Sequence, residues 1–136
     1  MKYEKGMINM NNEKRLDFAG LKEFLMTNYP EIELCYVFGS AKNGFVKKDS
    51  DLDLGLLFKS GFSKTLALQI SSELEEKLGC PVDIVVLNSA NPILLHEVLG
   101  NGVRLYEKNS YDRALFELNS FRMFVDSTYF LRRRYA

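Results

Sequence analysis

The sequence predicts an α/β (α+β) domain in which a small mixed β-sheet is flanked by helices. Two observations predict this class: four short apolar runs are spread along the chain, and segments with apolar residues at helical spacing lie between and around them. The expected strands cover residues 31–38, 52–58, 82–87 and 103–106. The expected helices cover residues 13–28, 63–78, 91–102 and 111–135.

Each expected helix carries an apolar repeat, a start signal or a stop signal. In residues 13–28 the apolar repeat consists of Phe18, Leu21, Phe24 and Leu25. In residues 63–78 it consists of Leu66, Ile70, Leu74 and Leu78. The residues that favour a helix start are Ser63, Asn91 with Pro92 after it, and Ser110. The stop signals are Pro30, Gly79, Pro81, Gly100 and Gly102.

The first expected strand, residues 31–38, is apolar on both faces. Its alternation places Ile32, Leu34, Tyr36 and Phe38 on one face and Cys35 and Val37 on the other. This pattern is typical of a central strand that is covered on both sides. The segment 40–50 is short, polar and contains glycine, so it has room for at most a turn or two of helix. The strands on either side of it are therefore expected to be neighbours.

Length and composition indicate one domain, residues 13–136, after a polar and flexible leader, residues 1–12. The 136 residues include 18 Lys and Arg and 18 Asp and Glu, so no overall positive field attracts a long nucleic acid or an anionic membrane. No apolar run approaches the roughly 20 residues that span a bilayer. We therefore expect no membrane helix and a cytoplasmic protein.

The cysteines and the single histidine do not suggest a metal centre. Cys35 and Cys80 are far apart and do not form a spaced ligand pair, so we expect free thiols in a reducing cytoplasm. His96 has no neighbouring cysteine, so a structural zinc site is not expected. It is interpreted as an ordinary helix residue.

Four residues at the two ends of the short polar segment suggest the chemistry. Gly39 and Ser40 close the first strand, where their backbone amides could turn toward a phosphate. Asp51 and Asp53 are two positions apart at the head of the next strand, so both carboxylates leave the same face. Paired hard oxygens beside a phosphate-holding turn suit magnesium and a nucleoside triphosphate. The pattern favours phosphoryl or nucleotidyl transfer.

Asp83 adds a third carboxylate in the third expected strand. Its alternating neighbours Val85 and Leu87 are apolar, so the carboxylate emerges from a face that otherwise looks buried. Burying a charge is costly unless it is paired, protonated or bound to a metal. A metal shared with Asp51 and Asp53 would meet that cost, so we expect the three carboxylates to converge on a divalent cation.

The acidic residues could instead belong to a solvated strand face or to a calcium loop. The side chains expected to face the core from residues 52–58 are Leu52, Leu54, Leu56 and Phe58. Asp51, Asp53 and Gly55 would then form an outward, solvated strand face, and this alternative stays open. A calcium loop is excluded, because its required glycine would fall on Leu54 and its required glutamate on Ser60.

The run FGSAKNGFVKKDSDLDLGLLF, with Asp83 in PVDIVVL thirty residues after Asp53, resembles the active-site signature of the DNA polymerase beta-like nucleotidyltransferases. The small size and the segment ILLHEVLGNGVRLYEKN are similar to the minimal nucleotidyltransferases, the MntA-like antitoxins that are paired with HEPN toxins. The resemblance covers residues 31–108 and implies the nucleotidyltransferase (polymerase beta-like) fold. Many relatives carry arginine directly after the Gly-Ser pair, where this chain has Ala41 and then Lys42, and Lys42 is the expected substitute.

The resemblance also implies a reaction. The chain would be a magnesium-dependent nucleotidyltransferase that takes AMP from ATP. Gly39 and Ser40 would hold the phosphates, and Asp51, Asp53 and Asp83 would hold two Mg²⁺ ions. Asp83 would also take the proton of the acceptor hydroxyl. The implied acceptor is a tyrosine of a cognate HEPN ribonuclease toxin, which would make the chain an antitoxin.

Two other functions stay open. A binding-only antitoxin would have the same fold but would neutralise its toxin by covering it. A nucleotidyltransferase for a small hydroxylated molecule such as an aminoglycoside is the other, and the absence of an added domain in 136 residues counts against it.

The expected C-terminal helix is apolar on more than one side. One side carries Leu115, Leu118, Phe121, Val125 and Tyr129, and another carries Phe116, Met123, Phe124, Phe130 and Leu131. One side can serve the core, while the second favours contact with another protein or a homo-oligomer; burial of both sides is the alternative. Arg132, Arg133 and Arg134 are interpreted as a solvated helix end, with an RNA or an acidic partner as the alternative.

Overall fold

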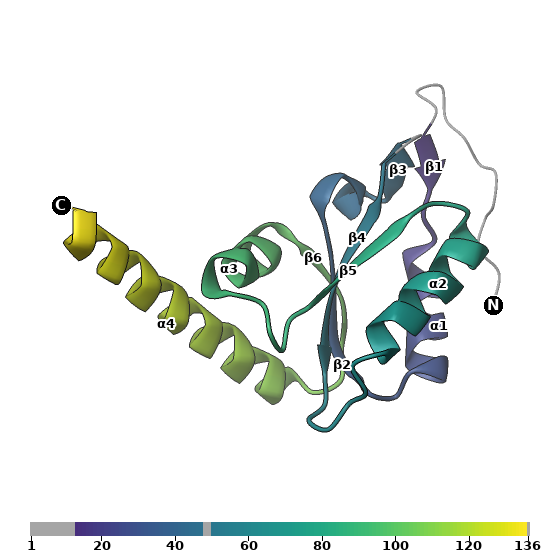
Figure 1. Cartoon of the computed structure of the whole chain (residues 1–136). Helices are drawn as coiled ribbons and strands as arrows, with labels where there is room; N and C mark the ends of the chain where they lie inside the picture. Colours follow the sequence, from purple (N-terminus) through teal and green to yellow (C-terminus); the bar gives the residue numbers. More distant parts are fainter. Residues whose placement is uncertain (1–12, 48–49, 136) are drawn as a thin grey trace.

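A mixed four-stranded sheet with the strand order β5-β4-β2-β6 forms the centre of the fold (Figure 1). The computed structural model describes residues 13–47 and 50–135, so the leader expected over residues 1–12 lies outside the described residues. The strands of this sheet are β2 (Ile32–Phe38), β4 (Leu52–Phe58), β5 (Val82–Val86) and β6 (Val103–Glu107). β2 pairs antiparallel with β4 and β6, while β5 pairs parallel with β4. The expected fold class, the central place of β2 and its pairing with β4 are confirmed.

The helices cover the two faces of the sheet in pairs (Figure 1). They are α1 (Phe18–Asn28), α2 (Leu66–Leu78), α3 (Pro92–Asn101) and α4 (Ser110–Tyr135). α1 and α2 bury their apolar repeats, with Leu25 and Leu74 fully enclosed, against one face of β2 and β4. α3 and the first half of α4 pack on the other face, where Leu95 and Phe116 meet Tyr36. The sheet is therefore covered on both sides, as the apolar strands predicted.

The N-terminal part of the chain departs from the prediction. The helix expected from residue 13 begins at Phe18, and the Asp17 side chain accepts a hydrogen bond from the Gly20 amide (3.0 Å) as its cap. The residues before it form β1 (Glu13–Arg15), which pairs antiparallel with β3 (Phe45–Lys47). The two paired strands are separated by about thirty residues of sequence. Such a pairing cannot be recognised from the apolar periodicity of the local sequence. For the same reason, β3 was not expected in the segment 40–50.

Several helix boundaries were also wrong by a few residues. α2 begins at Leu66, and its cap position is Thr65 rather than Ser63. At the start of α4 the Asn109 side chain, and not Ser110, accepts the hydrogen bond from the Asp112 amide (3.0 Å). The other signals are confirmed: the Asn91 side chain accepts from the Leu94 amide (2.8 Å), and Gly79 ends α2 in the left-handed conformation. Gly100 lies inside α3, which ends before Gly102.

Two residues of the central strands, Ile32 and Gly55, lie differently from the prediction. Ile32 belongs to the core under α1 and α2, while Leu34 belongs to the core under α3, because the pairing of β2 with β4 shifts register between them. Gly55 was expected to face outward, yet it is buried. A Cβ there would lie 2.8 Å from Cγ1 of Val98, so α3 packs directly on the bare backbone of β4.

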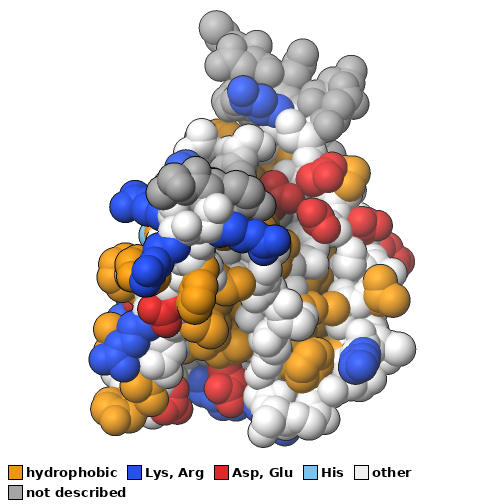
Figure 2. All heavy atoms as spheres, turned by 60° about the vertical axis from the view of Figure 1, so that its left-hand side comes forward, with side chains coloured by type: hydrophobic (Ala, Val, Ile, Leu, Met, Phe, Trp, Pro, Cys, Tyr) orange, Lys and Arg blue, Asp and Glu red, His pale blue; other side chains and the backbone are white. Residues whose placement is uncertain are grey.

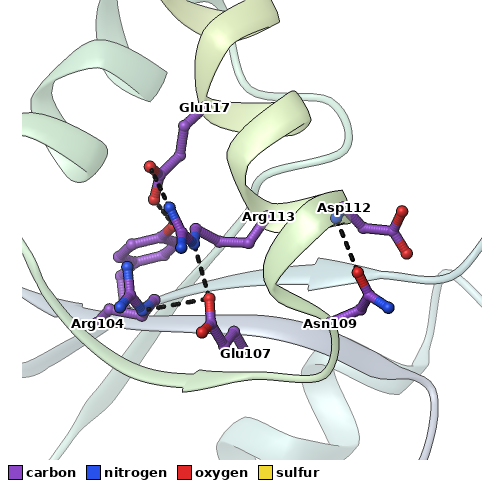
Figure 3. Close-up of polar contacts among 7 residues, drawn as sticks. Arg104, Glu107, Asn109, Asp112, Arg113 and Glu117 are labelled. Carbon is purple, nitrogen blue, oxygen red and sulfur yellow. Dashed lines mark hydrogen bonds and ion pairs between the residues drawn. The ribbon is translucent and has the colours of Figure 1, made fainter.

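α4 is fastened to the sheet at its first turns (Figure 3). The buried Tyr36 hydroxyl donates to Oε1 of Glu117 (2.6 Å), and Arg113 bridges Oε2 of Glu117 (3.4 Å) and Oε2 of Glu107 (2.6 Å). Arg104 also lies 3.6 Å from Glu107. Burial, and then the hydrogen bond to Glu117, raise the pKa of Tyr36, so its hydroxyl stays a donor. This network ties β2 and β6 to the base of α4.

The second half of α4 extends beyond the sheet (Figure 1). Phe124 faces inward and stacks on His96 of α3 with ring centroids 3.7 Å apart, so His96 has a packing role in its helix. The outer side chains of α4 are exposed, among them Leu118, Val125 and Tyr129. Neither this helix nor any other in the described part of the chain combines the length and apolarity that a bilayer crossing requires.

Candidate active site

The residues selected from the sequence meet at one end of the sheet. Gly39 directly follows β2, and Asp51 directly precedes β4. Phe38 pairs with Asp53 across the antiparallel β2–β4 ladder, and Asp53 pairs with Asp83 across the parallel β4–β5 ladder. The end of β2 and the starts of β4 and β5 therefore lie side by side. Side chains from three separate stretches of the chain reach the same region.

Gly39 and Asp53 are in direct contact. Gly39 has a φ of +69°, which L side chains rarely adopt, and a Cβ there would lie 2.3 Å from Oδ2 of Asp53 and 3.2 Å from its Cγ. The carboxylate of Asp53 thus lies against the bare Cα of the turn. Both the conformation and the contact require glycine at this position.

The turn after β2 is a short 3₁₀ helix, η1 (Gly39–Asn43). Ser40 and Lys42 are exposed on it, and Ala41 between them is fully buried in the core under α1. The Ala41 side chain therefore packs the turn against the core, and the polar groups that face solvent come from Ser40 and Lys42. The limited reach expected for the segment 40–50 is confirmed, since η1 and β3 occupy most of it.

The three aspartates share one negative region. Asp51 and Asp83 are exposed, whereas Asp53 is half-buried between the strands. Partial burial, and then the negative charges of Asp83 and Asp51, raise the pKa of Asp53 above its ordinary value. The carboxylates of Asp83 and Asp51 are thus near enough to destabilise the ionised form of Asp53. A bound cation would remove this repulsion.

The donor set fits magnesium. It consists of carboxylate oxygens from Asp51, Asp53 and Asp83, with no histidine or thiolate, and hard oxygen ligands suit Mg²⁺ rather than zinc. Within residues 13–47 and 50–135, no three His, Cys, Asp or Glu side chains already meet the geometry of a metal site. The convergence of the three carboxylates on one ion therefore stays a prediction, which the strand pairing and the repulsion at Asp53 support.

A groove beside η1 was not expected from the sequence. It is lined by residues of β1, the start of α1, the end of η1 and the start of β3, including Arg15, Asp17, Asn43 and Phe45. Arg15 had been placed in a helix, where it had no relation to the turn. The sequence carries no signal for this groove. In the structure the amide of Leu16, next to Arg15, donates to the Gly44 carbonyl (2.7 Å) and holds the two segments together.

Comparison with known proteins agrees with this geometry. Residues 20–111 match the family model "Polymerase beta, Nucleotidyltransferase". The chain belongs to this family of nucleotidyltransferases, which confirms the resemblance found in the sequence. The matched range ends at the second residue of α4, so nearly all of that helix lies outside it.

Individual relatives show how far the similarity extends. The chain is 28% identical over 102 residues to the protein adenylyltransferase MntA of Shewanella oneidensis, covering 75% of this chain and 73% of that protein. A protein of Methanocaldococcus jannaschii is 36% identical over 67 residues, which cover 49% of this chain and 72% of that protein. A crystal structure of a toxin–antitoxin complex with AMP-PNP contains a similar chain, with a TM-score of 0.73 and 25% identity, covering 89% of this chain and 100% of that one.

Proposed function

We propose that this nucleotidyltransferase is an antitoxin that transfers AMP from ATP to a tyrosine of a cognate HEPN ribonuclease toxin, with magnesium as its metal. Family membership supports the reaction class. The similarity to a protein adenylyltransferase supports AMP as the transferred group and a protein as the acceptor. The similarity to a chain of a toxin–antitoxin complex with AMP-PNP supports the partner and the nucleotide.

One observation carries the site assignment: Asp53 lies between Gly39 and Asp83, in contact with the first and paired with the second. A phosphate held at the turn would therefore lie next to the carboxylates that bind its counterions. Because Asp53 is destabilised by Asp83 and Asp51, the site is preorganised to take up positive charge.

The chain's own groups have distinct roles in this proposal. The backbone amides at Gly39 and Ser40, with the Ser40 hydroxyl, bind phosphate oxygens, and the exposed Lys42 supplies the positive charge. Asp51 and Asp53 would hold magnesium, with Asp83 as the third ligand, and Asp83 would accept the proton of the tyrosine hydroxyl. Magnesium, when bound, neutralises the charge of the triphosphate and of the leaving pyrophosphate.

The direct test follows the mass of the partner protein. Purified protein, ATP and MgCl₂ are incubated with the toxin encoded beside it, and intact mass spectrometry is expected to show addition of AMP. The double variant Asp51→Asn/Asp53→Asn is expected to lower the rate by on the order of a thousandfold or more. Glu76→Gln, which neutralises an exposed carboxylate on α2 outside both the site and α4, is the control and should keep full activity. A folded wild-type protein that never modifies the partner would refute the proposal.

The exposed apolar side of α4 favours a second candidate, a binding-only antitoxin. Figure 2 shows apolar and basic side chains gathered on the face that α3 and α4 present to solvent. The larger exposed apolar residues of α4 are Tyr111, Leu115, Leu118, Phe121, Met123, Val125, Tyr129, Phe130 and Leu131. If the Asp51→Asn/Asp53→Asn variant still neutralises the toxin fully in cells, covering rather than chemistry is the mechanism.

A further inference from the structure

The strand that carries Asp83 lies at the edge of the sheet. β5 has β4 on one side and, among the described residues, no strand on the other. On the inner side the Leu52 amide donates to the Pro81 carbonyl (2.9 Å), and Leu52 pairs with Val82. Backbone groups of successive residues alternate between the two sides of a strand, so the amide and carbonyl of Val82 point away from β4. These two groups need partners outside the sheet.

Two side chains of α2 supply those partners. The Ser71 hydroxyl donates to the Val82 carbonyl (2.8 Å), and the Val82 amide donates to Oε1 of Glu75 (3.0 Å). Ser71 and Glu75 are one helical turn apart, so they reach the same point of β5 from one face of α2. Val82 is only 5% exposed, so in the folded protein these two side chains, rather than water, satisfy its polar backbone groups.

Asp83, the next residue, has no such support of its own. Among residues 13–47 and 50–135, no side chain or amide donates a hydrogen bond to the Asp83 carboxylate. The position of that carboxylate is therefore set by the backbone of β5. Asp83 pairs with Asp53 across the β4–β5 ladder, so its carboxylate stays beside Asp53 only while the edge strand keeps its place next to β4. The contacts at Val82 hold the edge strand at the adjacent residue.

We infer that Ser71 and Glu75 are positioning residues, which hold Val82 so that Asp83 stays beside Asp53 in the geometry needed for metal binding and nucleotidyl transfer. This inference rests on the proposed function, because it takes Asp83 as a ligand of the magnesium site. Neither side chain touches the reacting groups. They act on the site indirectly, because they hold the backbone of Val82, the residue before Asp83. Outer-shell contacts commonly act on metal ligands in this way.

The variants separate this role from general stability. Ser71→Ala/Glu75→Ala removes both contacts, whereas Glu75→Gln and Ser71→Thr keep an acceptor and a donor in the same places. Glu76→Ala, an exposed neighbour on α2, is the surface control. Ile70→Val trims a buried side chain of the same helix, and so lowers the melting temperature while both hydrogen bonds to Val82 stay in place.

Two measurements need no partner protein. Hydrogen exchange of the β5 segment is expected to speed up in Ser71→Ala/Glu75→Ala and to stay at the wild-type rate in the conservative variants. Binding of Mn²⁺ as a magnesium substitute, followed by electron paramagnetic resonance, is expected to weaken by about tenfold in the double variant. Ile70→Val and Glu76→Ala should bind Mn²⁺ as the wild type does.

The transfer assay then tests the consequence for catalysis. In Ser71→Ala/Glu75→Ala, kcat should fall by about tenfold and the MgCl₂ concentration for half-maximal rate should rise by a similar factor. If the double variant merely contained less folded enzyme, kcat would fall but the MgCl₂ concentration for half-maximal rate would stay unchanged. A rise in that concentration therefore identifies a positioning role. Glu75→Gln should restore both values to within about twofold of wild type.

The outcomes distinguish the two ideas. If the double variant binds Mn²⁺ as tightly as wild type and exchanges β5 amides at the wild-type rate, the positioning role is wrong, whatever the activity. If Glu75→Gln is as impaired as Ser71→Ala/Glu75→Ala, the charge of Glu75 matters and its hydrogen bond to Val82 does not, which also overturns the inference. A wild-type protein that binds Mn²⁺ and ATP but transfers no AMP refutes the proposed function instead.

Discussion

At the scale of single residues, the contact between Gly39 and Asp53 is a tightly constrained feature of the candidate site. The turn must follow β2 immediately, and the carboxylate must come from the strand that pairs with β2. Only a residue without a side chain lets the two approach. The Gly-Ser pair was predicted from the sequence as a phosphate turn, but the reason for the glycine is its contact with a carboxylate.

Gly39→Ala tests this contact. The added methyl group would meet Oδ2 of Asp53 and force the turn or the carboxylate to move, so the rate of AMP transfer should fall by about a hundredfold. Gly61→Ala is the control, because Gly61 also has a positive φ (+82°) but nothing lies within 4 Å of its Cβ position. It carries the same backbone strain of about 1 kcal/mol and should keep its activity. Equal activity in the two variants would show that the contact does not matter.

Asp53→Asn should separate stability from activity. Because burial and the charges of Asp83 and Asp51 raise the pKa of Asp53, its ionised form costs stability at neutral pH. Removing the charge should therefore raise the melting temperature of the metal-free protein while abolishing transfer. Differential scanning fluorimetry in the presence of a chelator measures the first effect. A lower melting temperature would mean that repulsion at the site is not significant.

At the scale of secondary structure elements, the junction of β6 and α4 shows how a helix outside the matched family range is attached. Arg113 of α4 lies between Glu107 of β6 and Glu117 one turn further along the helix (Figure 3). The salt bridges are partly exposed, so each contributes modestly. Together with the Tyr36 hydroxyl they set the direction in which α4 leaves the sheet.

The pH dependence of stability should report on this junction. The hydrogen bond from Arg113, and then the charge of Arg104, hold the pKa of Glu107 below its ordinary value. A depressed pKa contributes stability above the unfolded-state pKa, and the contribution is lost as pH falls through the folded-state pKa. Urea denaturation should therefore show Glu107→Gln less stable than wild type at pH 7, with the gap closing below about pH 4. Glu97→Gln, an exposed glutamate on α3, should show no such gap.

The boundaries of elements show which signals act locally. Asn91 and Gly79 cap their helices as predicted, because the hydrogen bond or backbone conformation concerned lies within a few residues. Ser63 and Ser110 are equally good capping residues, yet Thr65 and Asn109 occupy those places. Which of several adjacent polar residues starts a helix depends on where the helix docks. The sequence alone could not decide it.

At the scale of the whole molecule, the two helical layers leave one end of the sheet uncovered. α3 closes over Gly55, so the outward face expected along β4 is restricted to its start, where Asp51 and Asp53 lie. The alternative of a solvated strand face therefore applies to Asp51 and Asp53 and no longer to Gly55. The outer part of α4 is also exposed, since the described part of the chain does not bury it.

Removal of residues 129–136 tests whether that outer part serves the fold. Tyr129, Phe130 and Leu131 are 55%, 72% and 47% exposed, so the truncation should change the free energy of unfolding by less than about 1 kcal/mol. Leu95→Ala, which removes a buried side chain of α3, should cost about 2–5 kcal/mol in the same urea titration. A truncated protein as unstable as Leu95→Ala would show that α4 is part of the core along its whole length.

The sequence by itself determined the order of the four helices and of the four strands of the main sheet, the apolar repeats of α1 and α2, and the pair of aspartates at the start of β4. These properties depend on residues that are neighbours along a single segment, where the periods of strand and helix are visible. The family resemblance then predicted that Gly39, Ser40, Asp51, Asp53 and Asp83 belong to one site.

Only the tertiary structure decided how distant segments meet. The pairing of β1 with β3, the register shift after Ile32, the approach of α3 to Gly55 and the contacts of Ser71 and Glu75 with Val82 all join residues from different elements. Such contacts follow from which surfaces bury the most apolar area together, and that depends on the whole chain at once.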